Sequence, residues 1–395
     1  MKRFYSYIIL SLFLLLLPTG QASANDNDSI RLSLLTCAPG EEIYSLFGHT
    51  AIRYENFSQG TDLVFNYGLF SFNTPHFILR FALGKTDYQL GVTDYERFAA
   101  EYAFLGRSVW QQTLYLTRDE GRKLVRSLQE NYRPENRVYH YNFFHDNCAT
   151  RPRDKILESI TEKVVYPIAP LDSSCTFRSI VHEYCKGHPW ARFGIDLCIG
   201  SEADQPITQQ QTMFAPFYLM NIFNGIYISG KNYIRRLVAS KELVVDATPA
   251  PDESSWMPTP LQCSLLLFIL TAAATIYGIR RRTGLWGVDL FLFGMAGIVG
   301  CVLAFLALFS QHPAVSPNYL LWVFHPGQLL FLPYVVYCVR KGKRCWYLTL
   351  NLVVLTLFIL LLRAIPQEID FAVVPLALVL LVRSASHLIV TSKKR

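Results

Sequence analysis

The sequence predicts an exported α+β domain followed by an all-α bundle of five transmembrane helices. Hydrophobic residues make up 51% of the 395 residues and charged residues only 17%, which is more apolar than an ordinary soluble enzyme. The apolar residues are concentrated at the N-terminus and in the last third of the chain, whereas the part between mixes helix and strand signals. These two observations predict a membrane protein with one soluble domain.

The N-terminus has the order of a secretory signal. Lys2 and Arg3 precede an apolar run over residues 8–17, and small residues follow at 22–24. This order predicts a signal peptide over residues 1–24 with cleavage after Ala24. The alternative is an uncleaved anchor helix, but the apolar run is short for a bilayer.

Five further apolar segments lie in the C-terminal third, which we assign to a transmembrane domain over residues 261–395. Each approaches the roughly 20 residues that a helix needs to cross the hydrocarbon. The segments cover residues 261–279, 288–310, 319–339, 346–362 and 371–390.

Charge in the connecting loops predicts the orientation of this bundle. Lys and Arg gather after the first, third and fifth segments, while the loops 311–318 and 364–370 contain neither. By the positive-inside rule, these two loops and the preceding domain lie outside, and the C-terminus is cytoplasmic. We therefore expect a protein of the cell inner membrane with a periplasmic domain.

Some charges belong to the membrane rather than to a ligand. Part of the net charge of +7 comes from the cytoplasmic loops, so it does not indicate nucleic-acid binding. Asp289, Arg383 and His387 lie in or beside the apolar segments. Snorkelling or pairing between helices explains them better than a proton path does.

The exported domain is expected over residues 25–243, with a linker over 244–260 that contains four prolines. Residues 50–54 and 63–67 are rich in β-branched and aromatic residues and flank a turn-prone segment, which predicts an antiparallel pair of strands. Thr117 and Glu120 form a capping box and predict a helix from that point.

Five cysteines lie outside the apolar segments: Cys37, Cys148, Cys175, Cys185 and Cys198. Thiols in an oxidising compartment tend to pair, and an odd number leaves at least one free unless it pairs between chains. A bridge from Cys175 to Cys185, or from either to Cys198, is one interpretation. Buried unpaired thiols are an equal alternative.

Cys148 is the best candidate for a nucleophile. Apolar residues at helical spacing follow it, and Pro152 is tolerated only in a first helical turn, which predicts a helix beginning near Thr150. The positive end of that helix and the nearby Arg151 favour the reactive thiolate. The alternative is a structural or disulfide-bonded cysteine.

A thiol nucleophile needs a base, and His49 is the first candidate because it follows a glycine turn at the start of a predicted strand. His145 and His140 are competitors that lie close to Cys148 in sequence. Asn66 or Asp62, both near the next strand, could orient the imidazole.

Metal and nucleotide cofactors are not expected. The sequence has no His-x-x-x-His motif and no paired Cys-x-x-Cys motifs, and glycine patterns typical of phosphate or dinucleotide binding are absent.

Three segments resemble the Lnb-type family of lipoprotein N-acyltransferases. These segments are residues 34–53 with Phe47-Gly48-His49-Thr50, then Asn66-Tyr67-Gly68, and then Asn147-Cys148-Ala149-Thr150. The resemblance extends to the five-helix membrane domain. The order of histidine before cysteine is also similar to that of circularly permuted papain-like enzymes. The resemblance to the Lnb-type family implies that His49 is the base and Cys148 the nucleophile.

The implied reaction moves an acyl chain from a phospholipid through a Cys148 thioester to the N-terminal amine of a diacylated lipoprotein. Asn147, Ala149 and Arg151 at the start of the helix are expected to support the oxyanion or the thiolate. Residues 213–228, which are rich in aromatics, could line a cleft at the bilayer surface or form a buried core helix.

Two other functions remain open at this point. A membrane-tethered cysteine peptidase or amidase acting on cell-wall peptide would use the same pair of residues, although one anchor would suffice for it. A non-catalytic envelope assembly protein would need Cys148 only as a structural residue.

Overall fold

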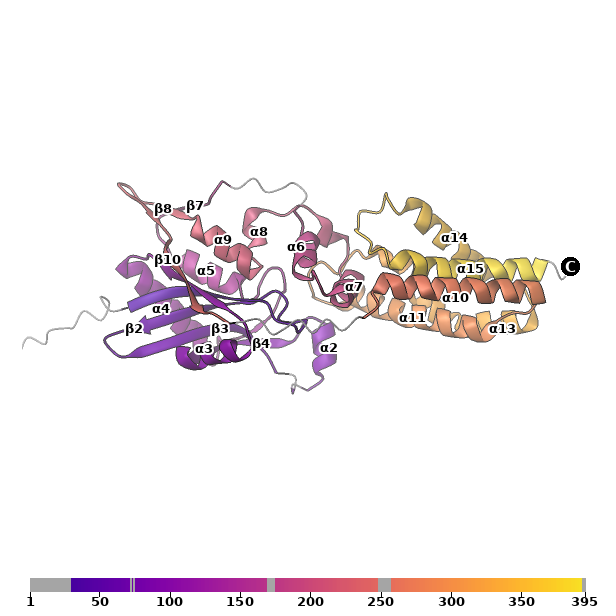
Figure 1. Cartoon of the computed structure of the whole chain (residues 1–395), viewed down its shortest axis with the longest axis horizontal. Helices are drawn as coiled ribbons and strands as arrows, with labels where there is room; N and C mark the ends of the chain where they lie inside the picture. Colours follow the sequence, from indigo (N-terminus) through magenta and orange to yellow (C-terminus); the bar gives the residue numbers. More distant parts are fainter. Residues whose placement is uncertain (1–29, 72, 74, 169–174, 248–256, 393–395) are drawn as a thin grey trace, which may run out of the picture.

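The computed structural model describes residues 30–71, 73, 75–168, 175–247 and 257–392. The expected signal peptide over residues 1–24 lies outside this part of the chain. The molecule is elongated, with the α+β domain at one end and a helical bundle at the other (Figure 1). The order of a β-rich domain and then a helical region agrees with the sequence prediction.

A seven-stranded antiparallel sheet forms the centre of the domain, in the order β10-β5-β1-β2-β3-β4-β6. Its strands are β1 (Ile30–Cys37), β2 (His49–Asn56), β3 (Thr61–Leu69), β4 (Asp87–Asp94), β5 (Val109–Leu114), β6 (Val138–His140) and β10 (Val238–Val245). The antiparallel pairing of β2 with β3 confirms the predicted strand pair. Val244 and Val245, which we assigned to the linker, belong to β10.

Helices cover both faces of this sheet. Neighbouring residues of a strand point to opposite faces, and apolar residues at neighbouring positions therefore make both faces apolar. Leu34 packs in a core with α4 (Arg118–Tyr132), α5 (Thr150–Ser159) and α9 (Pro216–Asn224), whereas Leu35 packs against α3 (Tyr95–Phe104) on the other face. The capping box that begins α4 is present as predicted. Most apolar residues of α9 are buried, which agrees with the core-helix alternative for residues 213–228.

The remaining elements of the domain lie between the large sheet and the bundle, or at the end of the domain that is away from the bundle (Figure 1). They are α2 (Phe77–Ala82), α6 (Phe177–Tyr184), α7 (Pro189–Cys198), η1 (Ser201–Asp204) and α8 (Gln209–Thr212), with a small sheet of β7 (Lys163–Val165), β8 (Tyr227–Ser229) and β9 (Ile234–Arg236). Aromatic and aliphatic residues of α6, α7 and η1 form a separate core beside Phe47 and Phe144.

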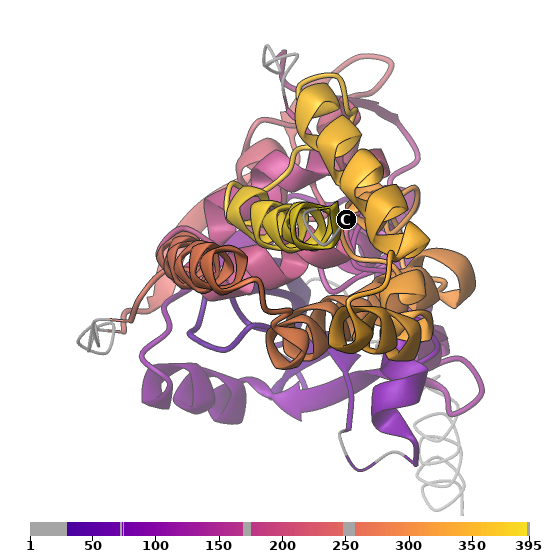
Figure 2. The same cartoon turned by 90° about the vertical axis from the view of Figure 1, so that its right-hand side faces the viewer.

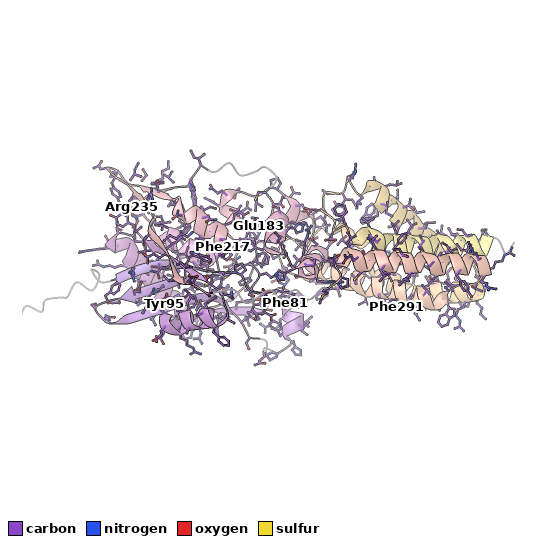
Figure 3. The ribbon with its side chains drawn as sticks, in the orientation of Figure 1. Phe81, Tyr95, Glu183, Phe217, Arg235 and Phe291 are labelled. Carbon is purple, nitrogen blue, oxygen red and sulfur yellow. The ribbon has the colours of Figure 1, made fainter. Side chains whose placement is uncertain are left out.

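In the bundle, three helices are long and apolar enough to cross a membrane: α10 (Pro260–Arg281), α11 (Trp286–Phe309) and α15 (Val373–Ser392). They run side by side and are seen end-on in Figure 2. The fourth apolar helix, α14 (Trp346–Leu361), has 16 residues and is therefore only about 24 Å long. The outward side chain of Phe291 on α11 is labelled in Figure 3.

The third predicted span is broken rather than continuous. Residues 319–341 form η2 (Tyr319–Trp322), α12 (Pro326–Leu330) and α13 (Leu332–Lys341), and the helical axis bends by 73° at the break. Pro333 cannot donate a backbone hydrogen bond to the preceding turn, and its ring clashes with that turn, which accounts for the break. The five apolar segments thus form three full-length helices, one bent pair and one short helix among the described residues.

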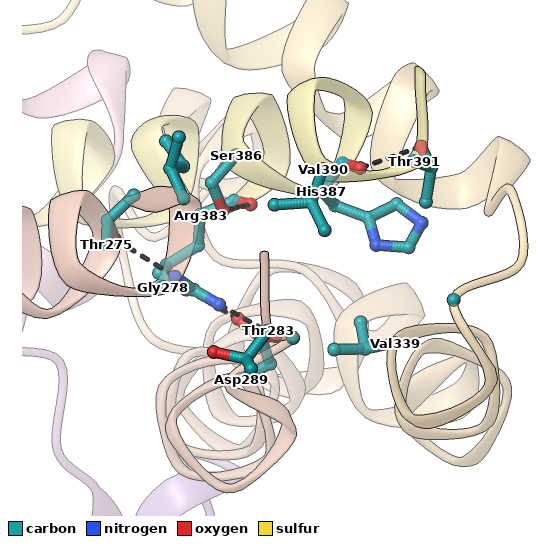
Figure 4. Close-up of a pocket in the computed structure, with 13 residues that line it drawn as sticks. Thr275, Gly278, Thr283, Asp289, Val339, Arg383, Ser386, His387, Val390 and Thr391 are labelled. Atoms are coloured by element: carbon teal, nitrogen blue, oxygen red, sulfur yellow. Dashed lines mark hydrogen bonds and ion pairs between the residues drawn. The ribbon is translucent and has the colours of Figure 1, made fainter. Parts of the chain in front are cut away.

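A buried ion pair connects two of the long helices. Arg383 on α15 donates to both carboxylate oxygens of Asp289 on α11, over 2.7 and 3.0 Å, and to Thr275 of α10 over 3.0 Å. Figure 4 shows these side chains with His387 lining the same small cavity. The pairing between helices that we expected for Asp289 and Arg383 is therefore present.

The loops at one end of the bundle contact the domain directly. The Gln311 amide donates to the Leu83 carbonyl over 2.9 Å, and the Ser201 amide donates to the Pro317 carbonyl over 2.9 Å. Gln367, in the loop after α14, donates to the Ile199 carbonyl over 3.2 Å. The two loops without Lys or Arg thus lie on the same side of the bundle as the domain, as the charge pattern predicted.

Candidate active site

His49 and Asn66 lie at one edge of the large sheet. His49 is the first residue of β2 and is paired in register with Cys37, the last residue of β1. Asn66 is near the end of β3, opposite Ala51. Because His49 and Asn66 occupy diagonal positions on adjacent strands, their side chains can meet.

The imidazole of His49 is held by Asn66, since its Nε2 lies 3.2 Å from Asn66 Oδ1. Burial lowers the pKa of His49 to about 4, against the opposing effect of this hydrogen bond, and the nearby positive charge of Arg107 lowers the pKa further. Asp62, the other candidate for orienting His49, instead accepts two hydrogen bonds from Arg53, over 2.8 and 2.6 Å. Asn66 is therefore the partner that the structure brings to His49.

Cys148 lies directly before α5, which begins at Thr150 as predicted. The turn is held by Asn147, a buried residue whose Oδ1 accepts from the amides of Ala149 and Thr150, each over 2.8 Å. The Asn147 side-chain amide donates to the carbonyls of Phe143 and Phe214, over 2.7 and 2.9 Å. Asn147 thus fixes the turn that carries the thiol.

Two expectations about this turn need correction. The Ala149 amide is occupied by Asn147, so it is not an available oxyanion donor. Arg151 is directed to Asp146, with hydrogen bonds of 2.6 and 2.8 Å, and its guanidinium lies over the Tyr139 ring. The reason in both cases is local: the Asn147 side chain caps the start of the helix, and Arg151 pairs with the carboxylate five residues before it.

The sulfur of Cys148 has polar neighbours from three elements. The Tyr141 hydroxyl donates to it over 3.8 Å. The backbone groups of Thr50 and of Cys148 itself lie close enough to lower the pKa of the thiol. Burial raises the pKa of the thiol, and the Tyr141 hydroxyl, these backbone groups and Arg107 oppose the rise. Thr50 follows His49 directly, so the thiol lies against the start of the strand that carries the imidazole.

The other cysteines and histidines of the domain are in different surroundings. Cys37 is fully buried, and burial raises its pKa to about 12, so it is an unreactive thiol. Neither Cys185 nor Cys198 forms a disulfide bond. His140 is exposed beside Asp87, and His145 is exposed with its ring against Phe177. Cys148, which is partly exposed, is the reactive candidate.

Sequence reasoning missed Tyr141 and Arg107. Tyr141 was visible only as one aromatic residue among several before Cys148, and it reaches the thiol because β6 ends at His140 beside β4. Arg107 lies in the loop between α3 and β5, where its Nε donates to the Ala38 carbonyl over 2.8 Å. No sequence signal distinguishes this arginine from the others. Among the described residues, no group of three His, Cys, Asp or Glu side chains could hold a metal ion.

Comparison with known families agrees with this division into a domain and a bundle. Residues 20–178 match the model of the Lnb N-terminal periplasmic domain, and residues 252–395 match that of the Lnb transmembrane domain. Together, the two ranges cover more than half of the chain. No curated protein and no solved structure matches it. The chain belongs to the Lnb family, and its periplasmic domain joined to a transmembrane domain makes it an inner-membrane protein.

Proposed function

We propose that this protein is a lipoprotein N-acyltransferase in which Cys148 is the nucleophile, His49 the base and Asn66 the residue that orients the base. The observation that carries the proposal is the meeting of a helix-initial thiol with the start of the strand that bears a neutral, hydrogen-bonded imidazole. Membership of the Lnb family supports a role in lipoprotein modification.

The hydrogen bond to Asn66 supports a specific role for each nitrogen of His49. If Nε2–H donates to Asn66 Oδ1, the other nitrogen, Nδ1, carries the lone pair that accepts a proton. With a pKa of about 4, the imidazole is neutral near pH 7. The Cys148 thiol, whose pKa is raised, is also neutral there. The proton then moves during the attack rather than before it.

In the first half-reaction, the Cys148 sulfur attacks the ester carbonyl of a phospholipid while its proton moves to His49. The ester C–O bond breaks, the leaving oxygen takes the proton from His49, and a lysophospholipid departs from the thioester. The hydroxyl of Tyr141, which lies 3.8 Å from the Cys148 sulfur, is the donor proposed for the oxyanion. Burial raises the pKa of Tyr141 well above its usual value, so the hydroxyl keeps its proton.

In the second half-reaction, the neutral N-terminal amine of a diacylated lipoprotein attacks the thioester. The C–S bond breaks, the amine proton moves to His49, and His49 returns it to the Cys148 thiolate. The product is an amide, which restores the free thiol. Water must be kept from the thioester, because hydrolysis would convert the enzyme into a phospholipase.

The proposed fold is that of a circularly permuted papain-like domain. Two features support it: α5 begins just after the cysteine and packs on an antiparallel sheet, and the strand that carries the histidine precedes the cysteine in the chain. We also propose that the catalytic domain lies in the periplasm and the C-terminus in the cytoplasm. Such a domain can perform the same chemistry on a cell-wall peptide, so the test must separate the two substrates.

The test uses Cys148→Ser and His49→Ala in the full-length protein, with Cys198→Ser as the matched control. Mass spectrometry of lipoprotein N-termini is expected to show a free amine with both site variants and an acylated amine with the control. Incubation of the wild type with phospholipid should add one acyl mass at Cys148. Unchanged N-acylation in both site variants would refute the proposal, and loss of cell-wall cleavage instead would favour the peptidase.

A further inference from the structure

Helix α2 is attached to the end of a membrane-spanning helix. α11 ends at Phe309, and the next residues bind the C-terminal end of α2: His312 Nε2 donates to the Phe81 carbonyl over 2.6 Å, and the Gln311 amide donates to the Leu83 carbonyl. A side chain at Gly84 would lie within 3.0 Å of the backbone at 311–312. α2 is therefore fixed at the depth where α11 leaves the bundle (Figure 1).

The outer face of α2 is apolar and exposed. Ile78 is 84% exposed, Leu79 53% and Phe81 48%, and no residue of this six-residue helix is buried. Figure 3 shows Phe81 beside the junction between the domain and the bundle. Large apolar side chains at this depth are typical of a segment that lies in the interface of a bilayer.

A row of aromatic rings connects α2 to the nucleophile. Neighbouring ring centroids are 5.9, 6.0, 5.1 and 4.4 Å apart, and the last ring carries the hydroxyl that donates to Cys148. We call these residues the aromatic row: Phe81, Phe77, Phe70, Tyr88 and Tyr141. Gly68 lies beside the end of the row, since a Cβ atom there would be in ordinary contact with Tyr141 and Cys148, at 3.4 and 3.5 Å.

We propose that Ile78 and Leu79 insert into the periplasmic leaflet and that the aromatic row guides a phospholipid acyl chain from there to Cys148. The inference rests on the proposed acyl transfer. It adds the periplasmic leaflet as the source of the acyl donor and the aromatic row as the path of the acyl chain to Cys148. Rings offer an apolar surface of fixed shape at little entropic cost, which suits an acyl chain. The attachment of α2 to the end of α11 favours a bilayer over a soluble partner as its occupant.

The first test places a photoreactive benzoylphenylalanine at position 78 or 234 of the full chain in phospholipid nanodiscs. Ile234 is the matched control, because it is 72% exposed and lies on β9 in the small sheet remote from the bundle (Figure 1). Irradiation should attach phospholipid at position 78 and not at position 234. Equal labelling at both positions, or none at 78, would overturn the membrane contact.

The second test compares two acyl donors for Ile78→Ser/Leu79→Ser and for Ile234→Ser. Thioester formation at Cys148 is measured with phosphatidylethanolamine vesicles and with a soluble short-chain ester. We expect the double variant to lower the ratio of vesicle to soluble rates by about ten-fold or more, because it removes apolar area from the interface. Ile234→Ser should keep the ratio of the wild type.

The outcomes separate this inference from the proposed function. A wild-type chain that forms no Cys148 thioester with either donor would refute the acyl transfer itself. A wild-type chain that forms the thioester, together with a double variant of unchanged ratio, would refute only the α2 path. Phe77→Ala extends the test to the aromatic row, since a vesicle rate equal to that of the wild type would exclude the row as the path.

Discussion

The membrane bundle and the candidate active site both hold ionisable side chains, but they satisfy them differently. In the bundle, Arg383 meets the two oxygens of Asp289 and the hydroxyl of Thr275, so charge and hydrogen-bonding capacity are matched. In the candidate site, Cys148 and His49 are partly exposed, and neither has an opposite charge in direct contact among the described residues. The first arrangement holds helices together, and the second leaves groups that can exchange a proton.

This difference indicates which buried groups are structural and which are reactive. A charge in a buried ion pair keeps its ionisation state and is poorly available for proton transfer. A thiol and an imidazole that lack such a partner and have shifted pKa values are neutral and can transfer a proton.

The largest effect is expected in the bundle. Arg383→Leu leaves Asp289 buried without a partner, which should lower the free energy of unfolding by about 3–5 kcal/mol. Arg383→Leu/Asp289→Leu, which removes both charges, should recover most of that loss. Thermal unfolding of the detergent-solubilised chain measures both. If the single variant unfolds like the wild type, the ion pair does not hold the helices.

A smaller effect is expected from Tyr141→Phe, which keeps the ring of the aromatic row and removes the hydroxyl. The loss of one oxyanion donor should lower the acyl-transfer rate by about 100-fold. The pKa of the Cys148 thiol should rise further, because the hydroxyl opposes the effect of burial. The rate of Cys148 alkylation against pH checks this, and Tyr139→Phe is the control. An unchanged rate and pKa would remove Tyr141 from the site.

The smallest effect concerns pH. His49 accepts a proton only when it is neutral, and burial lowers its pKa to about 4, so the acid limb of kcat/KM should lie near pH 4 rather than near 6.5. Between these values, activity should be retained. Arg107→Gln removes a charge that lowers this pKa and should move the limb to higher pH. A limb near 6.5 in the wild type would contradict the buried imidazole.

Much of the architecture was predictable because it depends on local patterns. The β2–β3 pair followed from β-branched and aromatic runs, the start of α4 from the Thr117–Glu120 box, and the start of α5 from Pro152. The candidate nucleophile and base also came from short motifs. Local sequence determines these features because strand alternation, caps and proline act within a few residues.

Other features depend on residues that are distant in the sequence. Loop charge predicted which ends of the bundle face the domain, but not the break at Pro333 inside an apolar stretch. The pattern at the start of α5 suggested the Ala149 amide as a donor, but the Asn147 side chain occupies it, and Phe214 helps to hold Asn147 in place. Tyr141 was not distinguished from the aromatic residues around it.

Hydrophobic length and short motifs were sufficient to predict the membrane domain, the α+β domain and the candidate residues Cys148 and His49, because these signals do not depend on distant residues. Their surroundings depend on tertiary packing: the Asn66 side chain contacts His49, the Tyr141 hydroxyl contacts Cys148, and α2 is attached to the end of α11. These contacts join residues 7 to 231 positions apart. Packing of the whole chain creates them, and no local pattern encodes them.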